Sequence, residues 1–137
     1  MLKSERSLIA SAVDELLRYN IATPFVHRYV TEDMEIGGKL LRKGQLVFLG
    51  LGAANRDPAE FEQPDVFDIT RRDNRHIAFG RGHHYCIGAS LAKRELERAL
   101  LLMIERKPQL RLNAASPPEL MCDNIVLRGF HSLSLCC

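Results

Sequence analysis

Hydrophobic residues recur at helical spacing in two segments of the chain. The first segment predicts a helix over residues 4–19, in which Ser4 is placed to cap the first turn. The second predicts a longer helix over residues 88–106, which Pro108 ends. The apolar faces comprise Leu8, Ile9, Ala12, Val13, Leu16 and Leu17 in the first helix and Leu91, Ala92, Leu96, Ala99, Leu100 and Met103 in the second.

Between these helices the pattern changes to short apolar runs separated by turn residues, which is typical of β-hairpins. The predicted strands cover residues 28–30, 34–36, 39–41 and 45–51, with turns at Gly37-Gly38 and Gly44. A short helix is predicted to open at Asp57-Pro58, with Asp57 as its cap. An irregular stretch over residues 63–76 follows.

After the second helix, three further apolar runs predict a small C-terminal sheet. They cover residues 109–112, 125–127 and 130–135. The expected fold class is therefore mixed α and β, mainly α.

The composition is that of one soluble domain with a modest core, because 137 residues carry 46% hydrophobic and 26% charged side chains. A formal net charge of +2 argues against nucleic acid as a partner. The longest aliphatic run, from Ala99 to Ile104, is far shorter than a membrane span of about 20 residues. The N-terminus lacks the apolar core of a signal peptide, which favours a cytoplasmic location. The cysteines expected to be free thiols are Cys86, Cys122, Cys136 and Cys137.

One segment carries a candidate metal ligand. Residues 79–88 read FGRGHHYCIG, so Cys86 lies on a glycine-rich loop immediately before the second helix. A cysteine ligates a metal only as the thiolate, and the unpaired N–H groups of a helix N-terminus stabilise negative charge. Glycines also let such a loop adopt left-handed conformations and approach a flat ligand closely.

Other readings fit parts of this loop. An arbitrary lone cysteine is most often a small buried apolar residue. A dinucleotide fingerprint GxGxxG fails, because Tyr85 stands at its third glycine position. A zinc-binding module is a weaker alternative: His76, His84 and Cys86 are potential ligands, but the chain has no CxxC pair and no repeated His/Cys pair at finger-like spacing.

The first helix also carries an acid and a base three residues apart, Glu15 and Arg18. Residues at this spacing lie on one side of a helix and can form an ion pair. Most such pairs are exposed and stabilise a protein by less than about 1 kcal/mol. Taken alone, this pair predicts nothing more.

Together, the loop and the charged pair resemble the cytochrome P450 family. Residues 79–88 fill every fixed position of its haem-binding loop, FGxGxHxCxG, and Glu15-Leu16-Leu17-Arg18 matches its ExxR motif. Asn55-Arg56-Asp57-Pro58 supplies Arg56 as the third member of the family's Glu-Arg-Arg triad. The resemblance implies that Glu15, Arg18 and Arg56 fix the helix to the loop around haem through charge-assisted hydrogen bonds.

The same resemblance implies that Cys86 is the proximal thiolate ligand of the iron in haem b. Phe79 is expected to shield the sulfur, and backbone N–H groups after Cys86 to donate to it. His84 and Arg28 are the expected partners of the haem propionates, although a solvated strand residue is an equal alternative for Arg28. The cofactor-binding positions are Phe79, Gly80, Gly82, His84, Cys86, Gly88 and Arg28.

Substrate contacts are expected to form an apolar wall, for which ordinary core packing is the alternative. The wall comprises Ala22, Thr23, Pro24, Phe25, Val126 and Leu127. The region from Arg71 to Arg98 holds seven Lys/Arg and three Asp/Glu, a net charge of +4. It predicts a docking face for an acidic electron donor of the ferredoxin or flavodoxin type. A solvated helix face is the alternative.

The resemblance spans nearly the whole chain but only the C-terminal third or so of a complete P450. Residues 1–137 are therefore expected to be a single partial domain without the family's helix that carries an acid-alcohol pair over the haem. The expected function is a haem-thiolate monooxygenase that inserts one atom of dioxygen into an apolar organic substrate. The alternative is a truncated, catalytically inactive haem-binding or interaction remnant.

Overall fold

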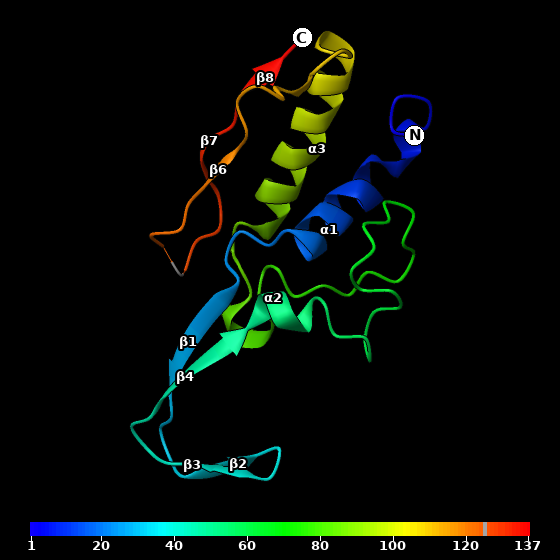
Figure 1. Ribbon diagram of the computed structural model, residues 1–137. Helices are drawn as coiled ribbons and strands as arrows, with labels where there is room; N and C mark the ends of the chain where they lie inside the picture. Colours follow the sequence, from blue (N-terminus) through cyan, green and yellow to red (C-terminus); the bar gives the residue numbers. More distant parts are fainter. Residues whose placement is uncertain (125) are drawn as a thin grey trace.

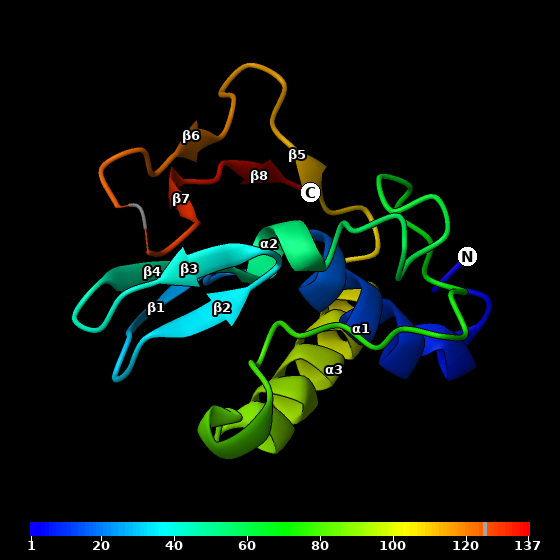
Figure 2. The same cartoon turned by 90° about the horizontal axis from the view of Figure 1, so that it is seen from below.

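The computed structural model describes residues 1–124 and 126–137. Two helices, α1 (Ile9–Tyr19) and α3 (Ala89–Arg106), pack against each other, and a ribbon of strands extends away from them (Figure 1). The long irregular segment between the ribbon and α3 passes beside α1 (Figure 2). The N-terminal helix, this segment and the start of α3 are thereby brought together.

Helix α1 begins later than the sequence predicts. A short 3-10 turn, η1 (Arg6–Leu8), precedes it, and the hydroxyl of Ser4 donates to the carbonyl of Met1 at 2.9 Å. Ser4 is therefore not the helix cap, and that prediction was wrong. The predicted apolar positions Ile9, Ala12 and Val13 are buried.

The ribbon is made of two antiparallel pairs. Strand β1 (Phe25–Tyr29) pairs with β4 (Leu46–Gly50), and β2 (Met34–Ile36) pairs with β3 (Lys39–Leu41) at the tip (Figure 1). The bounds of β2 and β3 are those that the sequence predicts. Gly37, Gly38 and Gly44 all have positive φ, which confirms the predicted turns.

The short helix of this region lies before the predicted position. Helix α2 (Leu51–Ala54) follows β4 directly, and residues 57–60 form a turn. The carboxylate of Asp57 accepts the N–H of Ala59 at 2.9 Å, which closes a local turn in place of a helix. The predicted helix at Asp57-Pro58 was wrong. A second 3-10 turn, η2 (Gly82–His84), lies within the cysteine loop.

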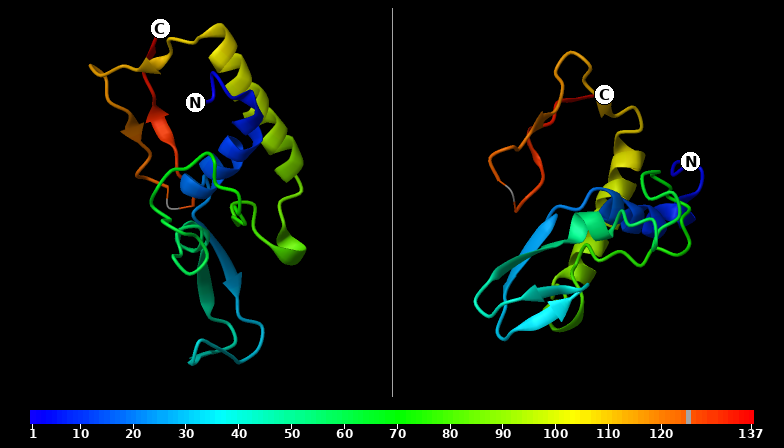
Figure 3. Two further views of the ribbon diagram at one scale, coloured as in Figure 1. Left: turned by 90° about the vertical axis from the view of Figure 1, so that its right-hand side faces the viewer. Right: turned by 60° about the horizontal axis from the view of Figure 1, so that its bottom comes forward.

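The C-terminal segment is an extended arm with two separate strand pairs, not one sheet (Figure 3). In these pairs β5 (Arg111–Leu112) lies beside β8 (Leu135–Cys136), and β6 (Glu119–Leu120) beside β7 (Phe130–Ser132). Residues 126–127 are not in a strand, whereas Ile125 lies outside the described residues. Arg128 donates its N–H to Ala22 at 2.8 Å and attaches the arm to the segment after α1.

The core is small and contains charge. Its apolar members are Ile9, Ala12, Val13, Ile21, Val30, Leu51, Phe61 and Ala89. Glu15, Arg18 and Asn55 are buried beside them. Large side chains such as Phe48 and Leu91 remain exposed. Within the described residues, no helix is both long and apolar enough to cross a membrane.

Candidate functional site

The pair predicted on α1 is fully buried. The side chains of Glu15 and Arg18 are both 0% exposed. Arg18 donates from Nε to Oε2 of Glu15 at 2.7 Å and from one terminal nitrogen to Oε1 at 2.8 Å. This bidentate geometry is the strong form of a carboxylate–guanidinium contact, unlike the exposed pair that is common at this spacing.

Arg18 also reaches three carbonyls of the irregular segment. It donates to Asn55 at 2.9 Å, to Pro64 at 2.8 Å and to Val66 at 3.1 Å. Its guanidinium therefore supplies hydrogen-bond donors to carbonyls that no helix or strand satisfies in this part of the segment.

Glu15 receives its remaining donors from the same segment. The N–H of Asp68 donates at 2.8 Å, Nε of Arg71 at 3.3 Å and the amide of Asn74 at 3.1 Å. The second arginine on Glu15 is therefore Arg71, not Arg56, and the predicted composition of the triad was wrong. The carboxylate of Asp68 accepts both the N–H and the hydroxyl of Thr70, and this turn brings Arg71 back toward α1.

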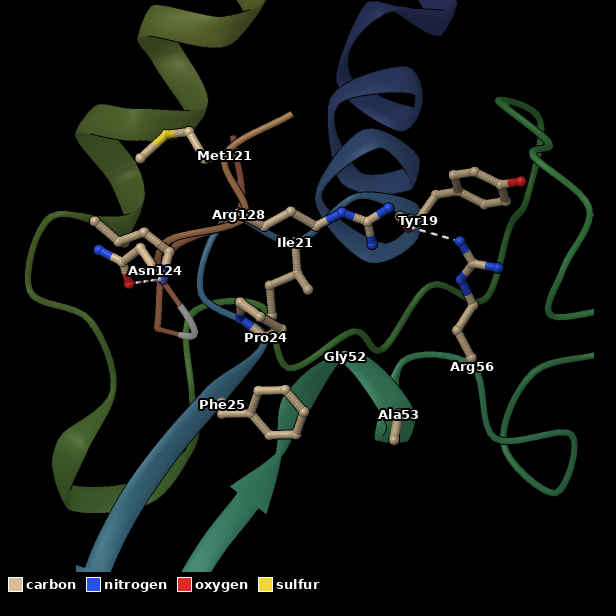
Figure 4. Close-up of a pocket in the computed structure, with 11 residues that line it drawn as sticks. Tyr19, Ile21, Pro24, Phe25, Gly52, Ala53, Arg56, Met121, Asn124 and Arg128 are labelled. Atoms are coloured by element: carbon tan, nitrogen blue, oxygen red, sulfur yellow. Dashed lines mark hydrogen bonds between the residues drawn. The ribbon is translucent and has the colours of Figure 1, made fainter. Parts of the chain in front are cut away.

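Arg56 occupies the end of α1 instead (Figure 4). It donates to the carbonyl of Tyr19 at 2.8 Å and to the carboxylate of Asp65 at 2.6 Å. Its guanidinium lies 3.9 Å from the centroid of the Tyr19 ring. The unpaired carbonyls at a helix C-terminus attract a cation, which explains why Arg56 binds at Tyr19, one helical turn after Glu15.

The contacts keep Glu15 ionised inside the core. Burial alone would raise its pKa, but the hydrogen bonds from Arg18 and from the N–H of Asp68, with the charges of Arg18 and Arg71, outweigh burial and leave the pKa below its ordinary value. The stabilisation is present near neutral pH and is lost as the pH falls through this lowered pKa.

Backbone hydrogen bonds fix the cysteine loop. The N–H of Cys86 donates to Phe79 at 2.9 Å, that of Gly80 to Ile77 at 2.9 Å and that of Ala89 to Cys86 at 3.2 Å. Gly80 and Gly82 have φ of 73° and 71°, the left-handed region that the sequence predicts for them. A Cβ on Gly80 would lie 3.4 Å from the carbonyl of His84, whereas Gly88 has a negative φ.

The sulfur of Cys86 lies beside the start of α3. A Cβ built on Gly88 would be 3.9 Å from Sγ, an ordinary contact distance. In the part of the chain that the structure describes, the backbone N–H groups of Ile87 and Gly88 make no hydrogen bond to a loop or turn carbonyl. These two donors are the ones expected to face the sulfur.

A cleft of about 810 Å³ opens over this loop. Its lining combines Cys86 with three potential cations, Arg28, Arg81 and His84, and with Phe79 and Gly80. The rest of the lining is mainly apolar. It comes from the end of α1 and the residues after it, the β1–β4 pair, α2 and the two residues before Phe79: Leu17, Ile21, Ala22, Thr23, Val26, Phe48, Leu49, Gly50, Leu51, Ala54, Ile77 and Ala78.

The family model described as Cytochrome P450 matches residues 3–127. The chain belongs to the cytochrome P450 family. It is 49% identical to the biotin biosynthesis cytochrome P450 of Bacillus subtilis over 81% of this chain and 28% of that protein. It is 41% identical to the polyketide biosynthesis cytochrome P450 PksS of the same organism over 96% of this chain and 33% of that one.

The fold is that of the family as well. The crystal structure of CYP109E1 from Bacillus megaterium in complex with corticosterone matches with a TM-score of 0.93 at 38% identity, over 98% of this chain and 36% of that one. The predicted fold class, a mixed α and β part of the P450 fold, is confirmed. The chain spans about a third of the length of these curated relatives.

P450 membership implies a haem, and the lining of the cleft fits one. A haem needs an axial ligand for iron, apolar contacts for the macrocycle and cations for two propionates. Cys86 offers the ligand, Leu17 and Val26 are among the apolar residues that line the cleft, and Arg28 and Arg81 offer the cations, with His84 as a further N–H donor. Arg81 is an addition that the sequence did not indicate.

The residues predicted as a substrate wall do not share one cavity. Ala22 and Thr23 line the cleft over Cys86. Pro24, Phe25 and Leu127 line a second pocket of about 520 Å³ beneath the C-terminal arm, where Arg56 and Arg128 also lie (Figure 4). Val126 is exposed at 48% and belongs to neither lining.

The zinc alternative lacks a ligand set. No three His, Cys, Asp or Glu side chains lie close enough to hold a metal ion within residues 1–124 and 126–137. His76 faces Asp14 of α1, with 3.5 Å between Nε2 and Oδ1.

The expected positive face is partly neutralised. Arg71 is engaged with Glu15, Lys93 pairs with Asp14 at 2.6 Å and Arg75 pairs with Asp73 at 2.9 Å. Arg94 lies 3.7 Å from Glu97. The sum of charges along the sequence therefore overstates the unpaired positive charge of the surface.

Sequence reasoning missed several residues of the site. Arg71, Asn74 and the N–H of Asp68 all bind Glu15, and Asn55 accepts the N–H of Ile77 at 2.8 Å. Only the Asp68-x-Thr70 spacing signals a turn that returns Arg71 to the helix.

Proposed function

We propose that this chain is the haem-binding part of a haem-thiolate monooxygenase that inserts one atom of dioxygen into an apolar organic substrate. The observation that carries the proposal is Cys86, held on a hydrogen-bonded loop at an apolar cleft whose cations suit two carboxylates. When bound, haem supplies the activation of dioxygen, with thiolate electron density favouring O–O cleavage.

The residues of this chain act by binding and orienting. Cys86 donates the thiolate, and the N–H groups of Ile87 and Gly88 lower the charge on its sulfur. Arg28 and His84, with Arg81, hold the propionates through charge-assisted hydrogen bonds. Glu15, with its two arginines, orders the segment that leads into the loop.

The cofactor that we propose is haem b, held without covalent bonds to the protein. The chain contains no CxxCH sequence for thioether attachment, and Cys86 is the one cysteine among the residues that line the cleft. We propose a cytoplasmic setting, which suits four free cysteines.

Labelled dioxygen tests the reaction. The product of the complete reading frame that contains this chain is loaded with haem and supplied with electrons, labelled dioxygen and a panel of fatty acids and steroids. We expect an oxygenated product that carries one labelled atom, and no such product from the Cys86→Ser variant. A haem-loaded protein that is reduced and binds carbon monoxide yet oxygenates nothing in the panel would support the inactive remnant instead.

The electron donor that we propose is an acidic ferredoxin or flavodoxin domain. Arg94 and Arg98 are exposed on α3, the helix that begins directly after the cysteine loop. Exposed charges steer a partner only over about 10 Å at 0.1 M salt. Electron transfer should therefore slow as salt is added, and Arg98→Gln should slow it at low salt only. Equal rates at low and high salt would contradict this choice of partner.

A further inference from the structure

Glu15 and the groups that bind it, from Arg18, Asp68, Arg71 and Asn74, form the Glu15 cluster. A second charged contact involves His76, two residues after Asn74. The side chain of His76 is only 5% exposed. The backbone N–H of Ala78 donates to its Nδ1 at 3.2 Å, and its Nε2 faces the carboxylate of Asp14 at 3.5 Å. Its ring centroid lies 6.1 Å from that of Phe79, the first residue of the cysteine loop.

Asp14 links this histidine to both long helices. It belongs to α1, and its Oδ1 also meets Nζ of Lys93 from α3 at 2.6 Å. Neither contact of Oδ1 has the alignment of a hydrogen bond, so charge attraction is what Asp14 supplies. Two consecutive acids of α1 thus hold one segment: Glu15 binds residues 68–74, and Asp14 faces His76.

The geometry requires one form of the imidazole. A nitrogen that accepts an N–H cannot itself carry a proton, so Nδ1 is bare and Nε2 carries the single proton of a neutral ring. Protonation of the ring would add a hydrogen to Nδ1, which would then point directly at the N–H of Ala78. The acceptor for that N–H would be lost, and with it the contact that closes the turn before Phe79.

The charges around the ring favour this neutral form. Burial lowers the pKa of His76 and outweighs the negative charges of Asp14 and Glu15, which raise it. The positive charge of Lys93 lowers it further, so that the pKa lies below its ordinary value. The turn is therefore secured above about pH 6.5, and its stabilisation is lost as the pH falls through the lowered pKa.

We propose that His76 is a positioning residue that holds the turn in front of Phe79 only while its imidazole is neutral, so that acid loosens the Cys86 loop. The spectroscopic test of this role rests on the proposed function, because it reads the thiolate–haem bond. The unfolding of the haem-free protein reads the same turn independently.

Two substitutions separate the hydrogen bond from the titration. In His76→Asn, the side-chain oxygen stands where Nδ1 stands and accepts the N–H two residues on, as in an Asx turn, but it does not titrate. In His76→Ala, both the acceptor and the titration are lost. The reduced carbon monoxide complex of each protein is recorded from about pH 8 to about pH 5, together with the unfolding midpoint of the haem-free protein.

We expect the wild-type protein to lose the thiolate-ligated spectrum below about pH 6.5, with the loop equilibrium changing about tenfold per pH unit for one proton. His76→Asn should retain the spectrum across this range, and His76→Ala should have a reduced thiolate fraction at every pH. Asp14→Asn should move the wild-type transition to lower pH, because Asp14 stabilises the protonated ring.

A wild-type acid transition that persists unchanged in His76→Asn would overturn the proposal, as would a full thiolate fraction in His76→Ala. If no protein binds haem, the proposed function fails by itself. The unfolding midpoints then decide the role of His76: the wild-type midpoint should fall with acid and that of His76→Asn should not, and parallel curves would overturn the role.

Discussion

Replacing Cys86 with serine is expected to abolish the red-shifted Soret band of the reduced carbon monoxide complex, which is the signature of thiolate-ligated haem. A serine hydroxyl stays protonated near neutral pH and does not replace a thiolate as an iron ligand. The cleft and its cations are unchanged by this substitution, so some haem should still bind. The measurement is the difference spectrum of equal amounts of reconstituted protein.

The matched control for this substitution is Cys122→Ser. Cys122 is also a free, exposed thiol, but it lies on the C-terminal arm and does not line the cleft over the loop. We expect its spectrum to equal that of the wild-type protein. A thiolate signature that survives Cys86→Ser and disappears in Cys122→Ser would show that the ligand has been assigned to the wrong cysteine.

Replacing Glu15 with alanine is expected to destabilise the fold by about 3–5 kcal/mol, the usual cost of removing one partner of a buried ion pair. Arg18 would then remain buried as an unpaired charge, and Asp68, Arg71 and Asn74 would each lose an acceptor. This loss is large against a typical domain stability of about 5–15 kcal/mol. Denaturant unfolding measures it, and haem incorporation should fail in parallel.

Glu95→Ala provides the control for this substitution, because Glu95 is exposed on α3 and has no ion pair within the described residues. Its effect should lie within about 0.5 kcal/mol of zero. Normal stability and haem content in Glu15→Ala would refute the structural role of the cluster.

Acid unfolding tests whether Arg71, and not Arg56, is the second arginine bound to Glu15. The charge of Arg71 helps to lower the pKa of Glu15, so Arg71→Gln should move acid unfolding to higher pH. Arg56→Gln breaks contacts at Tyr19 and Asp65 and should leave the acid transition of Glu15 in place. Equal shifts in the two variants would contradict the reassignment.

The parts of the fold that the sequence predicts well depend on local signals. The β2–β3 hairpin follows from apolar runs on either side of Gly37-Gly38, and the bounds of both strands agree with the structure. The bounds of helix α3 agree with the prediction to within one residue, because the apolar spacing and Pro108 are signals within or next to the helix. The cysteine loop is local too, and its fixed positions lie within ten residues.

The errors arise where a distant partner decides the structure. Asp57 caps a turn and not a helix, and nothing near it in the sequence separates these two uses of an aspartate. Arg56 and Arg71 are equally basic, and only the path of the segment between them determines which one reaches Glu15. His76 likewise depends on Asp14 and Lys93, which lie 62 and 17 positions away.

The central claim is that the sulfur of Cys86 is a ligand of haem iron, and X-ray absorption at the iron edge tests it most directly. The protein is expressed from the complete reading frame with Cys122, Cys136 and Cys137 replaced by serine, so that within this chain Cys86 alone can supply a thiolate. After haem loading, we predict one sulfur atom in the first coordination shell of the iron, and none when Cys86 is also replaced by serine. A first shell of nitrogen and oxygen atoms alone in the protein that retains Cys86 would contradict the claim.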